Sequence, residues 1–145
     1  MLPAETRAVL TLIVSGLTER WGSYAGHLNP DLENFVDTYR HSTVLVAVCD
    51  SQIVGVGILH PTSATAAQVV RMSVARAFRR QGIGTLILRE LVRIASERGI
   101  SNVTLETTAS WDSAVRFYER RGFVRTRIER GDQHFVLGER DLRTD

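Results

Sequence analysis

The hydrophobic pattern predicts two helices in the first forty residues. Apolar residues recur at helical spacing in the opening segment, at Ala8, Leu12, Ile13 and Leu17. A break from Gly22 to Pro30 follows. A second short helix is expected after it, with apolar positions at Leu32, Phe35, Val36 and Tyr39. Apolar residues at this spacing share one face, so each helix is expected to pack through that face.

The pattern then changes to that of buried strands. Thr43 to Val48 and Ile53 to Leu59 are runs of β-branched and apolar residues, and the turn-like pair Asp50-Ser51 separates them. Such runs, bounded by turn residues, predict a hairpin that ends at His60-Pro61. After a loop of small residues, Val70 to Val74 alternates apolar and polar positions and is predicted to be a third strand.

A long amphipathic helix is predicted from Gly82 to Arg98, with Gly99 as its stop. The elements expected after it are a strand at Val103 and Leu105, a helix from Asp112 to Arg120, and a hairpin of Phe123–Ile128 with Phe135–Leu137 around Gly131. This order predicts an α/β (α+β) fold. Its central sheet is mixed and mostly antiparallel, with a βαβ crossover and helices on both faces.

Composition limits the class of protein. With 145 residues, 43% of them hydrophobic, the chain fits a single domain over 1–145. The longest apolar run, Val44 to Cys49, is far shorter than the roughly 20 residues of a membrane span, and the start at Met1 lacks a basic targeting region. No membrane association is therefore expected. Cys49 is the only cysteine, which excludes an internal disulfide and fits a cytoplasmic location.

All 18 basic residues are arginine. The lack of lysine excludes a Walker A phosphate loop, which requires a lysine ammonium group. A formal net charge of +2 is too small to indicate a nucleic-acid-binding protein, so no nucleic-acid partner is expected. An arginine-rich nucleic-acid-binding domain stays a minor alternative, and it would predict affinity that falls steeply with salt.

The most specific motif is Arg79-Arg80-Gln81-Gly82-Ile83-Gly84-Thr85, which follows the third strand and opens the long helix. A helix N-terminus presents backbone N–H groups that favour an anion, and glycines let that anion approach the main chain. Glycines that only shape a turn are an alternative. A second alternative is a dinucleotide-binding loop in which Glu106 binds the ribose of the dinucleotide. Against it, Ile87 occupies the position of the third glycine in that motif.

The segment Val74-Ala75-Arg76-Ala77-Phe78-Arg79-Arg80-Gln81-Gly82-Ile83-Gly84 resembles the pyrophosphate-binding signature of the Gcn5-related N-acetyltransferase (GNAT) family. Phe117-Tyr118-Glu119-Arg120-Arg121-Gly122-Phe123 is similar to the family's second signature, and a strand with Leu105-Glu106-Thr107 lies between the two. The resemblance covers about Thr43 to Leu137. It implies acetyl-coenzyme A (acetyl-CoA) as co-substrate and no metal.

The resemblance also implies which residues hold the cofactor. The backbone of Met72, Ser73 and Val74 would bind the pantetheine arm, and an amide near Val74 would face the thioester oxygen. Backbone amides from Arg80 to Thr85 would bind the pyrophosphate, with the Arg79 or Arg80 side chain in support. Trp111 stands where the family has an asparagine that bonds the arm, so its ring is expected either to stack on the arm or to pack in the core.

The implied reaction is direct transfer of the acetyl group, in a ternary complex, to a primary amine of a small molecule or peptide. Tyr118 matches the family position of the general acid, with a core tyrosine as the alternative. Glu106 is the first choice for the general base because it ends the strand that would line the cofactor site, and a surface or ion-pair carboxylate is its alternative role. His60 is the second choice, and a base that acts through water stays open. A non-catalytic acyl-CoA-binding module of the same fold is the alternative function.

The first two helices are expected to select the acceptor. Aromatic and acidic residues there would suit a cationic amine, namely Trp21, Tyr24, His27, Asn29, Asp31 and Tyr39. They are equally expected as core and helix-start residues, whereas Arg71 would favour an anionic group. The family opens with a strand, but here a helical pattern begins near Met1, so that strand is expected to be missing or very short. An exposed sheet edge would follow, and a homodimer that covers it and a mis-assigned start are the two alternatives.

Overall fold

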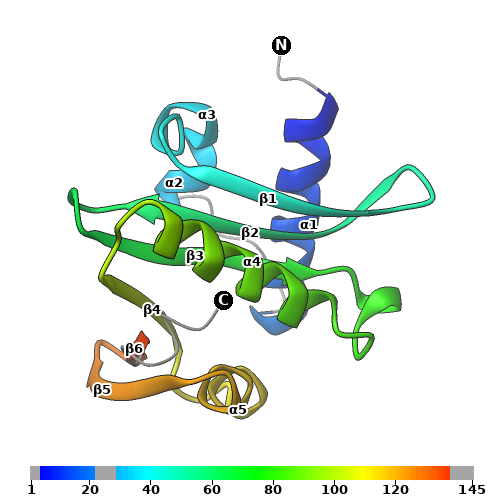
Figure 1. Ribbon diagram of the computed structural model, residues 1–145. Coiled ribbons are helices and arrows are strands. Elements are labelled where there is room, and N and C mark those ends of the chain that lie inside the picture. Colours follow the sequence, from blue (N-terminus) through cyan, green and yellow to red (C-terminus); the bar gives the residue numbers. More distant parts are fainter. Residues whose placement is uncertain (1–3, 22–28, 138–145) are drawn as a thin grey trace. The chain divides into compact units, whose positions relative to one another are not determined.

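The computed structural model describes residues 4–21 and 29–137 (Figure 1). It divides into two compact units. The first comprises Met1–Ile58 with Arg71–Leu88, and the second Leu59–Val70 with Arg89–Asp145. The unit boundaries fall inside two strands and one helix, so the division does not follow the chain order. The expectation of a single domain over 1–145 stays a prediction.

Six strands form one sheet in the order β1-β2-β3-β4-β6-β5. The strands are β1 (Thr43–Cys49), β2 (Gln52–Pro61), β3 (Ala66–Val74), β4 (Asn102–Thr108), β5 (Phe123–Glu129) and β6 (Asp132–Leu137). The helices are α1 (Ala4–Trp21), α2 (Pro30–Glu33), α3 (Phe35–Thr38), the 3₁₀ helix η2 (Arg76–Phe78), α4 (Ile83–Glu97) and α5 (Asp112–Arg120). β3 and β4 run parallel, whereas β6 is antiparallel to β4 and β5. The predicted mixed, mostly antiparallel fold class is confirmed.

Two sequence expectations about the elements are wrong. The second helix is split into α2 and α3 at Asn34, whose backbone leaves the helical region at φ −122° while its N–H donates to the Pro30 carbonyl. Asparagine is a weak helix former, so the helix breaks there although the apolar periodicity continues. β3 begins at Ala66 and not at Val70, because pairing with β4 extends the strand to Ala66. The alanines there have little strand preference of their own, so the sequence pattern did not predict this extension.

In the first unit, two glycines allow α1 and α4 to pack closely against the strands. A Cβ on Gly55 of β2 would lie 2.9 Å from Ile87 Cδ1 and 3.0 Å from Ile83 Cγ2, both on α4. A Cβ on Gly16 of α1 would lie 3.0 Å from Ser73 Oγ of β3. In this unit α4 lies in front of the strands and α1 behind them (Figure 1). The close approach at Gly55 sets the N-terminal turn of α4 directly against β2.

The second unit packs α5 on the hairpin of β5 and β6. Val103 and Leu105 of β4 and Phe135 and Leu137 of β6 are buried, and they alternate with less buried residues on both strands. Arg130 (φ 52°) and Gly131 (φ 84°) form the hairpin turn, as predicted at Gly131. Because alternate residues of a strand point to opposite faces, one face of this part of the sheet is the packed side.

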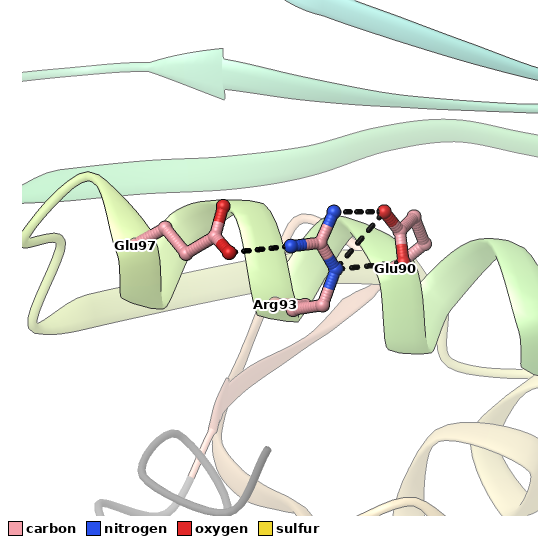
Figure 2. Close-up of polar contacts among 3 residues, drawn as sticks. All are labelled: Glu90, Arg93 and Glu97. Carbon is pink, nitrogen blue, oxygen red and sulfur yellow. Dashed lines mark hydrogen bonds and ion pairs between the residues drawn. The ribbon is translucent and has the colours of Figure 1, made fainter.

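The part of α4 in the second unit carries an exposed ion-pair ladder. Figure 2 shows the Arg93 guanidinium between the carboxylates of Glu90 and Glu97, which lie three and four residues away on the same helix. Hydrogen bonding to Arg93 lowers the pKa of Glu90, and Glu90 raises the pKa of Arg93. Pairs at this spacing support a helix.

The chain has no strand between residues 4 and 21, where α1 lies, and β1 forms one end of the sheet order. This agrees with the expectation of a missing or very short first strand. Residues 1–3 lie outside the described part of the chain. The expected homodimer stays a prediction.

Candidate functional site

The glycine loop before α4 has the backbone that an anion site needs. Arg80 and Gly82 both adopt positive φ, 64° and 82°, and α4 begins at Ile83. The Leu86 N–H donates to the Gly82 carbonyl at 3.0 Å, so the helical bonding starts there and the amides of the first turn point out of the helix end. A Cβ on Gly82 would meet no atom within 4 Å. The space beside Gly82, where a Cβ would stand, is therefore open.

The two arginines of this loop differ in their contacts. Arg79 donates to Glu19 of α1 through Nη1 at 2.8 Å and Nη2 at 3.1 Å, and its Nε donates to the Val74 carbonyl at 3.0 Å. It therefore ties the end of β3 to α1. Arg80 and Gln81 are exposed in the loop beside Gly82.

The end of β3 lies beyond its pairing with β4. The parallel ladder joins Ala66–Gln68 to Asn102–Thr104, three residue pairs at the start of both strands. Arg71 then adopts φ 54° inside the strand, a left-handed conformation that breaks a regular ladder. Met72, Ser73 and Val74 follow and are half-buried.

A polar cluster holds Arg71 in this conformation. Its Nε donates to Asp31 Oδ2 at 2.9 Å, and its Nη2 donates to Asp31 Oδ1 at 2.6 Å and to Asn29 Oδ1 at 3.0 Å. The Tyr39 hydroxyl donates to Asp31 Oδ2 at 2.6 Å. The cluster ties the beginning of α2 and the end of α3 to the irregular position of β3.

The cluster shifts the pKa of each of its ionisable members. Burial raises the pKa of Asp31, but hydrogen bonds from Arg71 and Tyr39 outweigh burial and hold it below its usual value. Burial, followed by Asp31, raises the pKa of Tyr39. Burial lowers the pKa of Arg71, and Asp31 reverses this and raises it. The Asp31 and Arg71 charges pair with each other, and the roles expected for these residues in acceptor selection stay predictions. Tyr24 and His27 lie outside the described residues, as does the Trp21 side chain.

The catalytic candidates lie in the second unit, on opposite faces of β4 and β6. The Tyr118 ring of α5 lies 5.9 Å from the Phe135 ring, on the face that carries Leu105 and Phe135. Glu106 and His134 are the next residues along these strands and pair across them, so they lie on the other face. Glu106 Oε2 lies 3.3 Å from His134 Nδ1.

Sequence reasoning missed His134, because only the strand register reveals the residue opposite Glu106. The other two candidates occupy strand and helix ends. His60 lies within the last residues of β2 and is half-buried. Trp111 is the N-cap residue of α5 and makes no capping bond with its side chain, and the helix begins at Asp112 as predicted.

Two further observations concern the residues that the structure describes. Across 4–21 and 29–137, no three or more histidine, cysteine, aspartate or glutamate side chains gather as a metal site requires. Within the same ranges, no helix combines the length and the apolar character needed to cross a bilayer.

Comparisons with known proteins define the class. A sequence model of the acetyltransferase (GNAT) family matches residues 7–123. An acetyltransferase of the GNAT family from Staphylococcus aureus has a similar structure, with a TM-score of 0.83 at 19% identity over 96% of both chains. The PaiA N-acetyltransferase from Thermoplasma acidophilum, solved with coenzyme A, has a TM-score of 0.78 at 17% identity over 92% of both chains. These likenesses show the fold of an acetyltransferase.

The chain belongs to the GNAT family of acetyltransferases, because the match to the family covers most of its length. A probable N-acetyltransferase, camello, from Xenopus tropicalis is 32% identical to it over 101 residues, which are 68% of this chain and 46% of the relative. The chain thus spans about half the length of the curated relatives that it matches.

Proposed function

We propose that this protein is an acetyl-CoA-dependent N-acetyltransferase that acts on a primary amine of a small molecule or peptide. The observation that carries the proposal is the open glycine loop at the start of α4, where Gly82 has φ 82° and no atom within 4 Å of a Cβ position. The coenzyme A bound to the related Thermoplasma acidophilum structure supports the same cofactor here.

The pyrophosphate would bind the backbone amides from Arg80 to Thr85. Arg80 is the better candidate for side-chain support, because Arg79 already donates to Glu19 and to the Val74 carbonyl. The pantetheine arm would bind along the backbone of Met72, Ser73 and Val74. The end of the β3–β4 ladder at Gln68 and Thr104 supports this assignment, since a strand edge without a partner strand can bond an extended ligand. Trp111 would contact the arm through its ring.

Acetyl transfer needs one group to take a proton from the amine and another to give a proton to the thiolate. The amine nitrogen attacks the thioester carbon and loses its proton to Glu106; the carbon–sulfur bond breaks, and Tyr118 protonates the sulfur. An amide near Val74 would stabilise the oxyanion. Transfer is direct, within a ternary complex.

A non-catalytic acyl-CoA-binding module is the second candidate. One observation favours it: the Tyr118 ring packs between Phe123 and Phe135, with ring centroids 6.0 Å and 5.9 Å away, as a core tyrosine would. Thiol release from acetyl-CoA in the presence of an amine panel separates the two candidates, because a binding module releases none.

Calorimetry on Gly82→Ala tests the loop, and Gly131→Ala is its matched control. Both glycines have positive φ, and a Cβ at either meets no atom within 4 Å, so both substitutions cost the same kind of backbone strain, about 1 kcal/mol. Only Gly82 lies in the proposed phosphate site. Gly82→Ala is expected to weaken acetyl-CoA binding, and Gly131→Ala to leave it unchanged; equal affinities would contradict the proposal. NAD and ATP are expected not to bind. A cytoplasmic location and the absence of nucleic-acid and membrane partners stay predictions.

A further inference from the structure

Glu106 and His134 form a pair across β4 and β6. They occupy directly opposed positions in the antiparallel register, and Glu106 Oε2 lies 3.3 Å from His134 Nδ1. The His134 side chain is 21% exposed and that of Glu106 is 43% exposed. The histidine is thus the more enclosed partner, and the carboxylate reaches further toward solvent.

We propose that His134 is a positioning residue for Glu106. His134 Nδ1, 3.3 Å from Oε2, restrains that oxygen, so that the second carboxylate oxygen is presented to the acceptor amine. The inference rests on the proposed function, in which Glu106 takes the amine proton. A glutamate side chain this exposed would otherwise populate several rotamers, and only some of them would place an oxygen at the amine.

The backbone around His134 is suited to this task. The neighbouring Gln133 is buried, and its Nε2 donates to the His134 carbonyl at 3.0 Å and to the Arg127 carbonyl at 3.1 Å. These bonds brace β6 against β5 beside the histidine. On the same strands, Leu105 pairs with Phe135 in the core, so the register that places His134 opposite Glu106 is set by buried residues.

A short series of variants tests the inference. His134→Leu removes the ring nitrogen and is expected to lower kcat about tenfold to a hundredfold, the range for losing a bond to a charged group, with KM for acetyl-CoA unchanged. His134→Asn can still donate an N–H from near the Nδ1 position and is expected to retain most of kcat. The double variant His134→Leu/Glu106→Gln is expected to be no slower than Glu106→Gln alone, because His134 acts only through Glu106. His41→Leu, an exposed histidine in the turn before β1, is the control.

Three results would overturn the inference: full kcat in His134→Leu, a loss in His134→Asn as large as in His134→Leu, or additive losses in the double variant. Acetyl-CoA affinity, measured by calorimetry, verifies that each variant is folded. An unsubstituted protein that binds acetyl-CoA but acetylates no amine would overturn the proposed function and the inference with it. An active unsubstituted protein with full kcat in His134→Leu would overturn the inference alone.

Discussion

Arg71 and Asp31 lie forty residues apart in the sequence and form a two-pronged ion pair, Nε to Oδ2 at 2.9 Å and Nη2 to Oδ1 at 2.6 Å. Arg71 has φ 54°, an unfavourable conformation for a residue other than glycine, and Met72 to Val74 follow it directly. The pair therefore holds the backbone immediately before the segment that is proposed to bind the pantetheine arm.

Breaking this pair is expected to destabilise the protein. Asp31→Ala leaves the Arg71 guanidinium, with a side chain only 21% exposed, without its carboxylate, and the expected loss is about 2 kcal/mol. Urea unfolding measures it. Asp37→Ala is the matched control, because Asp37 pairs with Arg40 at 2.7 Å but both side chains are at least 64% exposed, so a loss below about 0.5 kcal/mol is expected. Equal losses in the two variants would refute the stabilising role of the Arg71 pair.

The same pair predicts a pH dependence of stability. The pKa of Asp31 is lower in the folded protein than in the unfolded chain, so the unfolded chain binds the proton first as pH falls. The contribution of the pair is fully present at neutral pH, begins to fade below about pH 4 and is lost as pH passes through the folded pKa. The difference in unfolding free energy between the unsubstituted protein and Asp31→Asn should therefore shrink in acid. A difference that stays constant from neutral pH to about pH 3 would contradict this.

The close packing at Gly55 predicts a steric cost. Gly55→Ala places a methyl group 2.9 Å from Ile87 Cδ1 and 3.0 Å from Ile83 Cγ2, and overpacking of this kind costs about 1 to 2 kcal/mol. Thermal unfolding measures it. Ile87→Val removes the Cδ1 atom, so the double variant Gly55→Ala/Ile87→Val should be less destabilised than the sum of the two single variants. Strict additivity would show that the two positions do not compete for the same space.

The unequal contacts of Arg79 and Arg80 predict unequal effects on the cofactor. Arg80→Gln is expected to weaken acetyl-CoA binding about tenfold by removing a charged donor to phosphate, with little change in stability. Arg79→Gln is expected to act mainly on stability, because it breaks the pair with Glu19. Calorimetry with acetyl-CoA and urea unfolding of both variants separate the effects, and the reverse pattern would assign the phosphate role to Arg79.

Tyr118→Phe removes the hydroxyl and keeps the ring that contacts Phe117, Phe123 and Phe135. If the hydroxyl protonates the thiolate, kcat falls about a hundredfold while KM for acetyl-CoA and the melting temperature stay unchanged. Thiol release in steady state measures kcat. Unchanged kcat would assign Tyr118 a packing role only.

The local pattern of residues was enough to predict most elements and the glycine loop. The apolar repeat of α4 depends only on residues close together in the sequence, and so does its stop at Gly99 (φ 76°). The same holds for the turn at Asp50 and Ser51, which both adopt positive φ. The split of the second helix at Asn34 escaped prediction because the apolar periodicity continues across it. The early start of β3 at Ala66 escaped prediction because it depends on pairing with β4.

The sequence alone determined the fold class, most of the element order and the glycine-rich loop at the start of α4, because the hydrophobic period, glycines and helix ends act over a few residues. The tertiary structure alone decided that Arg71 and Asp31 neutralise each other, that Arg79 is held by Glu19, and that His134 lies opposite Glu106. Each of these depends on strand register or helix packing, which brings together side chains that are distant along the chain.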